Sequence, residues 1–153
     1  MRNNNIPRTQ RPRHRPKIFS MDTLTATLTE FISTFIFVFA GIGSRMAVRN
    51  LTGDDAAFGL IATVIAHAFV LSAAVYVGAR ISTGNPYTLC GHANPAVTFG
   101  AFMGGNIHFI RGLGYWIAQL LASVAACELL MFVTGGKVWL LVVLVFKIMV
   151  EMV

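Results

Sequence analysis

The chain has 153 residues, of which 56% are hydrophobic and only 12% are charged, and its mean hydropathy is +0.68. An average soluble domain carries about 25% charged residues, so this composition excludes an ordinary soluble domain and indicates a membrane protein. The net charge of +6 comes from the first seventeen residues, because the basic residues after them balance all the acidic residues of the chain.

The first segment, 1–21, is a basic tail that we predict to be disordered and cytosolic. It contains arginine and lysine but no acidic residue. A nucleic-acid-binding arm is disfavoured in a membrane protein, so no nucleic-acid partner is expected, whereas an acid-free, arginine-rich stretch leaves a transit peptide open. We favour an anchor that sets the topology and contacts anionic lipid of the bilayer, at about 1 kcal/mol per nearby basic residue.

Three segments are long and apolar enough to cross a hydrocarbon core, which needs about 20 residues. They cover residues 24–43, 56–79 and 112–133. A fourth apolar run, 138–146, is interrupted by Lys147 and is shorter than a spanning helix. With the half-helix described below, the prediction is an all-α membrane protein with three transmembrane helices, one re-entrant half-helix and an incomplete fourth hydrophobic segment.

Each predicted span carries a stripe of polar or small residues at helical spacing, which is typical of a face buried in a helix bundle. The members are Glu30, Ser33, Thr34, Phe37 and Gly41 on the first span, Thr63, His67, Val70, Ala74 and Gly78 on the second, and Gly112, Tyr115, Gln119, Ala122 and Ala126 on the third.

The basic residues near the span ends predict the orientation of the chain in the membrane. They form two groups: the tail, Arg80 and Arg111 on one side, and Arg45, Arg49 and Lys137 on the other. Cytosolic segments carry an excess of lysine and arginine. The tail and the loop before Asn94 are therefore expected to enter from the cytosol.

A helix-start signal lies between the second and third spans. Asn94 is a preferred N-cap residue and Pro95 suits the first helical position, where its missing N–H would have had no partner. Irregular backbone at membrane depth is tolerated only where it is buried in protein or lines a watery cavity. We therefore predict a short helix from Asn94 whose positive end points into a cavity.

Four motifs carry a resemblance to a known family. They are Thr-Glu-Phe-Ile-Ser-Thr at 29–34, Ala-His-Ala-Phe at 66–69, Gly-His-Ala-Asn-Pro-Ala-Val-Thr-Phe-Gly-Ala-Phe at 91–102 and Tyr-Trp-Ile-Ala-Gln-Leu-Leu at 115–121. In this order they resemble the first half of an aquaporin, of the major intrinsic protein family, and are most similar to the plant tonoplast intrinsic proteins. The resemblance covers residues 22–136, which we take as an aquaporin-like first repeat.

The resemblance implies a passive channel of six tilted helices and two half-helices, in which each inverted repeat gives one Asn-Pro-Ala. Asn94, Pro95 and Ala96 would form the pore motif of this repeat, with the Asn94 amide donating to a passing water. The carbonyl acceptors would come from the loop just before it, at Gly91, His92 and Ala93.

The same resemblance implies that His67 occupies the second-helix position of the outer selectivity constriction and that Glu30 supports the pore loop. It further implies water and small neutral solutes as partners, a homo- or hetero-oligomer with aquaporins, and a multi-pass protein of the vacuolar membrane. The resemblance implies no cofactor and no metal. The sequence shows no nucleophile paired with a base and no phosphate-binding loop, so no feature of it indicates an enzyme.

The sequence departs from the family pattern in three places. Extra residues lie within 83–90, the segment 137–153 resembles nothing that we can align, and no second Asn-Pro-Ala is present. We therefore expect a chain truncated to its first repeat that is inactive alone. The alternative is a non-conducting membrane protein that associates with or regulates full-length aquaporins, or a degraded gene product.

Each candidate site residue also has a plain structural interpretation. Asn94 would cap an ordinary turn in a soluble chain, but its place between two spans favours the pore motif. His67 is as readily a packed side chain as a pore-lining one, and His92 is favoured as a structural loop residue. Glu30 is favoured as a buried hydrogen-bond acceptor over a proton relay.

Three further side chains are singled out without a site. Glu128 lies nine residues after Gln119, which places it on the opposite helix face, toward lipid or another chain. We favour a snorkelling substitution near a helix end. Cys90 and Cys127 indicate neither a disulfide nor tetrahedral zinc ligation; Cys90 is expected to be reachable by thiol reagents and Cys127 to be packed.

Overall fold

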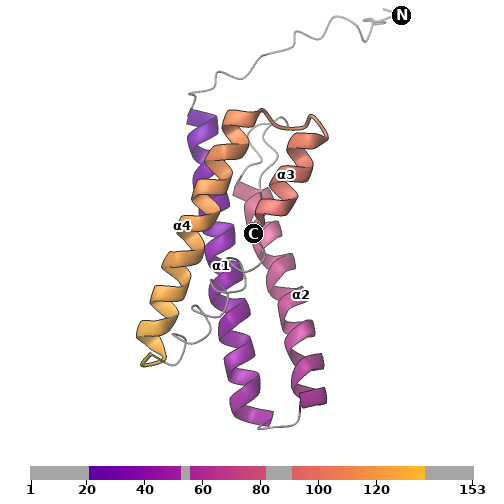
Figure 1. The fold of residues 1–153 in the computed structure, drawn as a ribbon, viewed down its shortest axis with the longest axis vertical. Helices are drawn as coiled ribbons and strands as arrows, with labels where there is room; N and C mark the ends of the chain where they lie inside the picture. The colour runs from indigo at the N-terminus through magenta and orange to yellow at the C-terminus, as the bar shows by residue number, and fades with distance from the viewer. Residues whose placement is uncertain (1–20, 53–55, 82–90, 137–153) are drawn as a thin grey trace, which may run out of the picture.

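The computed structural model describes residues 21–52, 56–81 and 91–136 and contains four helices (Figure 1). They are α1 (Met21–Thr52), α2 (Ala56–Ile81), α3 (Pro95–Met103) and α4 (Phe109–Val133). Helices α1, α2 and α4 are long and apolar enough to cross a membrane, whereas α3 is a helix of nine residues. No strand occurs among the described residues, so the all-α membrane fold is confirmed.

Helix α1 is longer than the predicted span 24–43. It has 32 residues, which at about 1.5 Å per residue exceeds the roughly 30 Å of hydrocarbon in a bilayer. Hydropathy locates the part of a helix that lies in lipid, whereas the helix itself continues through Arg45 and Arg49. Arg49 lies in the last turn, where a cation interacts favourably with the negative end of the helix dipole.

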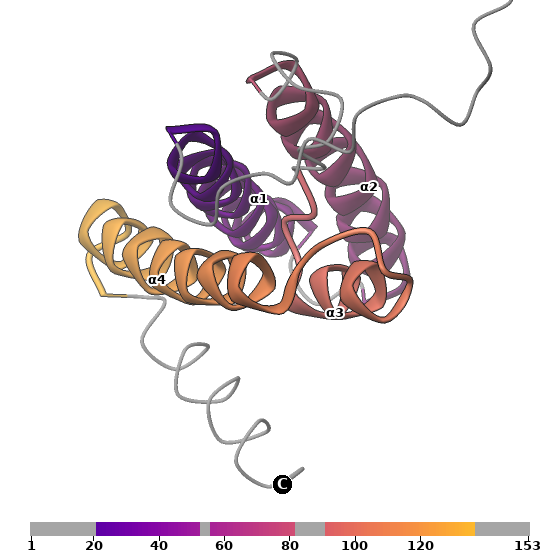
Figure 2. The ribbon, with the colours of Figure 1, turned by 90° about the horizontal axis from the view of Figure 1, so that it is seen from above.

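Helix α1 lies between α2 and α4 and packs against both, while α3 packs beside α4 (Figure 2). In Figure 1 α3 begins part-way down the height of the long helices, and from there it climbs toward the end at which α4 begins. The short helix is therefore re-entrant, with its N-terminal end inside the layer that the three long helices span and its C-terminal end at the surface.

The predicted stripes on the first and third spans are the buried faces of α1 and α4. All five stripe residues of α4 are buried. Four of the five stripe residues of α1 are buried, and the fifth, Phe37, is half-buried. The stripe of α2 is correct only near its end, where Ala74 and Gly78 are buried; Thr63, His67 and Val70 are half-buried. Among the described helices α2 has extensive contact with α1 alone, so this part of its predicted face is only partly covered.

The arginines separate to the two ends of the bundle as the sequence predicts. The start of α1, the end of α2 and the start of α4 lie toward the same end of the bundle (Figure 1), and this end carries Arg80 and Arg111. Arg45 and Arg49 lie toward the opposite end, in the last turns of α1. Arg111 is only 8% exposed and donates to Thr23 Oγ1 at 3.1 Å, which ties the start of α4 to the start of α1.

We expect the end that carries Arg80 and Arg111 to face the cytosol, because α1 begins at that end and the basic tail precedes α1 in the sequence. In sealed vesicles with the cytosolic face outward, added protease should remove the tail without detergent. Cleavage of the tail that occurs only after the vesicles are opened would reverse this orientation.

Candidate functional site

A buried carboxylate organises the loop before α3. Glu30, on α1, is fully buried. Its Oε1 accepts the backbone N–H groups of Gly91 at 2.7 Å and His92 at 2.9 Å, and its Oε2 accepts that of Ala93 at 3.0 Å. Gln119, on α4, donates from Nε2 to Oε2 at 2.9 Å. The Glu30 side chain therefore accepts hydrogen bonds from three residues of the loop and from one residue of α4.

The loop backbone can converge on one carboxylate because two of its residues adopt positive φ. Gly91 has φ 86° and Ala93 has φ 49°, and successive N–H groups in such alternating conformations form an anion-binding concavity. Glycine adopts this region freely, whereas a non-glycine residue is strained there by about 1 kcal/mol or more. The bonds to Glu30 compensate this strain at Ala93.

The same geometry orients the loop carbonyls. No described peptide bond is cis, and the C=O and N–H of a trans peptide point in opposite directions. The N–H groups of His92 and Ala93 point at Glu30, so the carbonyls of Gly91 and His92 point away from it. The loop therefore has donors on one side and acceptors on the other.

Helix α2 and the loop meet in backbone contact. A Cβ added at Gly78 would lie 2.5 Å from Gly91 Cα and 2.7 Å from Ser33 Oγ, and a Cβ at Gly91 would lie 3.0 Å from the carbonyl oxygen of Val75. The stripe of small residues on α2 includes Gly78, but nothing in the sequence shows that its neighbour is the loop.

Asn94 is the N-cap of α3, as its sequence position predicts. Its Oδ1 accepts the N–H of Ala96 at 2.8 Å, and Pro95 occupies the first turn. Because Oδ1 is engaged, the Nδ2 group is the part of the Asn94 amide that remains to donate. Asn94, Pro95 and Ala96 are all exposed in the described chain.

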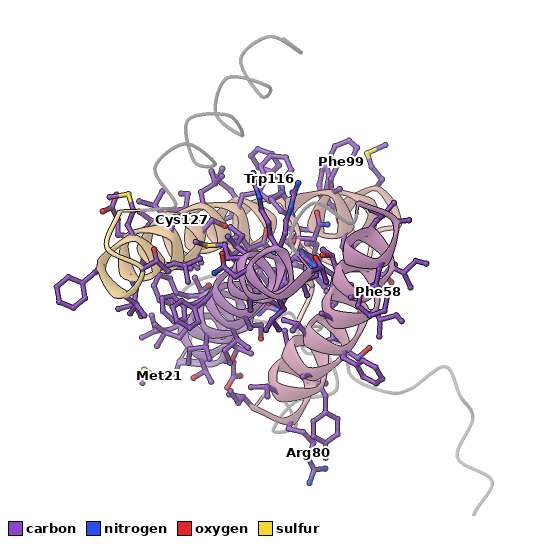
Figure 3. All side chains as sticks on the ribbon, turned by 90° about the horizontal axis from the view of Figure 1, so that it is seen from below. Met21, Phe58, Arg80, Phe99, Trp116 and Cys127 are labelled. Carbon is purple, nitrogen blue, oxygen red and sulfur yellow. The ribbon has the colours of Figure 1, made fainter. Side chains whose placement is uncertain are left out.

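Two side chains of α4 hold the start of α3. Trp116 Nε1 donates to the carbonyl oxygen of Pro95 at 2.9 Å. The Trp116 ring lies beside that of Phe99 at the outer side of α3 and α4 (Figure 3), with ring centroids 6.3 Å apart. Gln119 donates from Nε2 to Thr98 Oγ1 at 2.9 Å. The N-terminal end of α3 is therefore fixed by α4 from two directions.

Sequence reasoning did not assign roles to Thr98, Gln119 and Trp116. His92 Nδ1 lies 3.0 Å from Thr98 Oγ1, so Thr98 links the loop to α4. The available signal was that Thr98 follows Asn94 by one helical turn and that Gln119 belongs to the buried stripe of α4. Neither fact says which partners meet.

His67 lies apart from this loop. Its Nδ1 is 3.1 Å from the carbonyl oxygen of Thr63, and its ring packs edge-on against Phe37 with centroids 6.2 Å apart. A Cβ at Gly41 would lie 3.2 Å from its Nε2. Gly78, which contacts the loop, is about 16 Å further along α2 at 1.5 Å per residue. The structure thus separates His67 and Asn94 into two levels.

The remaining candidates are placed in part. Glu128 is exposed, on the face of α4 opposite the buried Gln119, and Cys127 is a half-buried free thiol. Cys90, the stretch 83–90 and the segments 1–20 and 137–153 lie outside the described residues. Within the described ranges no three His, Cys, Asp or Glu side chains group as metal ligands.

The chain matches the family model of the major intrinsic proteins over residues 17–151. It belongs to the major intrinsic protein family. The expected resemblance is confirmed, and the matched range extends beyond 22–136 at both ends. Members of this family are channels rather than enzymes, so the expectation of a non-enzymatic protein is confirmed at the level of the family.

Plant aquaporins are similar to this chain over most of its length. It is 60% identical over 117 residues to Aquaporin TIP1-2 of Musa acuminata, and 59% identical over 117 residues to Aquaporin TIP1-1 of Arabidopsis thaliana. Each alignment covers 75% of this chain and 44% of the relative. Probable aquaporin TIP1-1 of Oryza sativa subsp. japonica is 59% identical over 122 residues, 78% of this chain and 46% of the relative. The chain spans about half the length of these curated relatives.

Proposed function

We propose that this chain supplies one half of an aquaporin-type path for water and small neutral solutes, with Asn94 at its centre. The observation that carries the proposal is the polarity of the 91–94 loop. Glu30 accepts hydrogen bonds from the N–H groups of the loop, and the carbonyls of Gly91 and His92 point away from Glu30. The Asn94 amide keeps its Nδ2 group as a donor. A passing water molecule would find acceptors along the loop and then a donor.

The position of Asn94 at a helix N-terminus supports selectivity against cations. The end of α3 carries a partial positive charge of about half a unit. Such an end in a narrow pore opposes cations and protons while water passes. We assign His67 to a second constriction, about 16 Å from the level of Gly78, which agrees with its half-buried position on α2.

We infer the vacuolar membrane as the site of action, because the relatives carry the tonoplast-intrinsic-protein designation in their names. We also propose that the pore is completed by an aquaporin-family partner surface, in a homo- or hetero-oligomer. The exposure of Asn94, Pro95 and Ala96 supports this, since the described helices wall only one side of the motif.

The 153-residue polypeptide alone should therefore conduct little water. Liposomes that contain only the purified chain should shrink under an osmotic gradient at nearly the rate of empty liposomes. A fast rate with low activation energy would contradict this expectation and would indicate that two copies rebuild the pore; Asn94→Ala should then remove most of the increase.

The half-pore itself is tested by supplying the missing wall. Residues 21–136 would replace the corresponding part of Aquaporin TIP1-1 of Arabidopsis thaliana, to which this chain is 59% identical over 117 residues. We expect this chimera to conduct water. Its Asn94→Ala variant should lose about 90% of the conduction rate, because the loss of one hydrogen bond between neutral groups raises the barrier to water by roughly 1.4 kcal/mol. A chimera that assembles in the membrane and does not conduct would favour the non-conducting alternative.

A further inference from the structure

Three polar groups converge on one buried hydroxyl, that of Thr98 in α3. Thr98 is only 1% exposed. Its Oγ1 lies 2.9 Å from Gln119 Nε2, 3.0 Å from His92 Nδ1 and 3.2 Å from the backbone carbonyl oxygen of Asn94. A hydroxyl donates one hydrogen bond and accepts two. The arrangement therefore has a direction, which depends on where His92 carries its proton.

Two of the three directions follow from the chemistry of the partners. The Gln119 amide nitrogen can only donate, and it is identified as the nitrogen because it also faces the acceptor-only carboxylate of Glu30 at 2.9 Å. The Asn94 carbonyl can only accept. Thr98 therefore receives a hydrogen bond from Gln119, and its proton is available for either Asn94 or His92.

The tautomer of His92 decides between these two. If its Nδ1 carries the proton, His92 donates to Thr98 and Thr98 donates to Asn94, so all three contacts are hydrogen bonds. If its Nε2 carries the proton, Thr98 must donate to His92 Nδ1 and its bond to Asn94 is lost. Nε2 is buried without a hydrogen-bond partner among the described residues, so the second tautomer would also bury an unpaired N–H, which is rare in proteins.

We propose that His92 and Thr98 are positioning residues for the pore motif: neutral His92 donates from Nδ1 to Thr98 Oγ1, and Thr98 gives its only proton to the Asn94 carbonyl. This relay supplements the helical bond from Thr98 N to the same oxygen at 3.1 Å. It holds Asn94 in its extended conformation, φ −155° and ψ 127°, from which its side chain caps Ala96.

The role as positioning residues rests on the proposed function of Asn94, but the proton placement is a separate statement that needs no transport assay. Failure of the chimera to conduct would remove the function and leave the relay. A chimera that conducts, together with a His92 that does not carry its proton on Nδ1, would support the function and exclude the relay.

The test is a two-bond ¹H–¹⁵N correlation spectrum of the full chain in lipid nanodiscs with labelled histidine. His92→Gln assigns the signals of His92 by their disappearance. His67 is an internal reference, because its Nδ1 faces the acceptor-only carbonyl of Thr63 and must carry a proton. We expect His92 to show the pattern of a neutral ring with its proton on Nδ1. An Nε2–H pattern or a doubly protonated ring would overturn the proposal.

A matched pair of variants tests the role of the hydroxyl. Thr98→Val keeps the shape and removes the acceptor, so His92 should lose the Nδ1–H pattern and hydrogen exchange of the Ala96 amide should rise about tenfold. Thr98→Ser keeps the hydroxyl and should preserve both. An unchanged His92 pattern and Ala96 exchange in folded Thr98→Val would also refute the relay. If Thr98→Val does not fold, as shown by loss of the His67 signal, the wild-type and Thr98→Ser spectra still decide.

Discussion

Replacing Gly78 with alanine should prevent α2 from closing onto α1 and the 91–94 loop. The added Cβ would lie 2.5 Å from Gly91 Cα and 2.7 Å from Ser33 Oγ. Gly91 Cα belongs to the backbone and cannot rotate away, so α2 must move as a whole. We expect the free energy of unfolding to fall by about 3 kcal/mol, the upper part of the range for an overpacked core. Titration with sodium dodecyl sulfate in mixed micelles, followed by tryptophan fluorescence, measures this loss.

Gly100→Ala is the matched control for this substitution. Gly100 lies within α3, and a Cβ there would meet nothing within 4 Å. Alanine is favoured over glycine inside a helix by up to about 1 kcal/mol, so this variant should be as stable as the parent or slightly more stable. Equal losses from Gly78→Ala and Gly100→Ala would show that the close approach of α2 to the loop is not required.

The helices and the start of α3 were predictable because their signals are local. Hydropathy over about 20 residues marks a span, and an N-cap followed by proline marks a helix start from two adjacent positions. Asn94 and Pro95 therefore place α3 correctly without any knowledge of the other helices. The burial of Glu30 and Gln119 followed in the same way, from helical spacing alone.

The meeting of these residues was not predictable from local signals. Glu30 lies 61 positions before Gly91 and 89 positions before Gln119, and their contact depends on how α1 and α4 pack. The left-handed conformation of Ala93 gives no signal in the sequence, because alanine rarely adopts it. Convergence of the loop on one carboxylate is a property of the assembled bundle.

Helix α2 shows a second limit of pattern analysis. Its stripe of small and polar residues predicts a buried face, yet Thr63, His67 and Val70 remain half-buried. Periodicity identifies a face that suits a neighbour, but it does not say whether the neighbour is within the described chain. The partial exposure of this face agrees with the proposal that a further surface completes the pore.

Replacing Glu30 with alanine should release the 91–94 loop from α1. Three backbone N–H groups and the Gln119 amide would lose their acceptor, and each buried group left unsatisfied costs about 1–3 kcal/mol unless water reaches it. We expect the unfolding free energy to fall by roughly 3–5 kcal/mol, because water that enters the vacated space satisfies part of the four freed groups. Hydrogen exchange of the backbone amides of Gly91, His92 and Ala93 should accelerate, whereas the amides in the core of α4 should exchange at nearly their original rates.

Glu30→Gln separates the shape of the side chain from its acceptors. Glutamine keeps one acceptor oxygen but turns an NH₂ group toward donors, so a smaller loss of about 1–3 kcal/mol is expected, with exchange faster at only part of the loop. Glu128→Gln is the control, because this carboxyl is exposed on α4 and its substitution should change stability by no more than about 0.5 kcal/mol. A Glu30→Ala variant as stable as Glu128→Gln, with unchanged exchange in the loop, would mean that the loop is held without its carboxylate. The relay through Thr98 would then be its principal support.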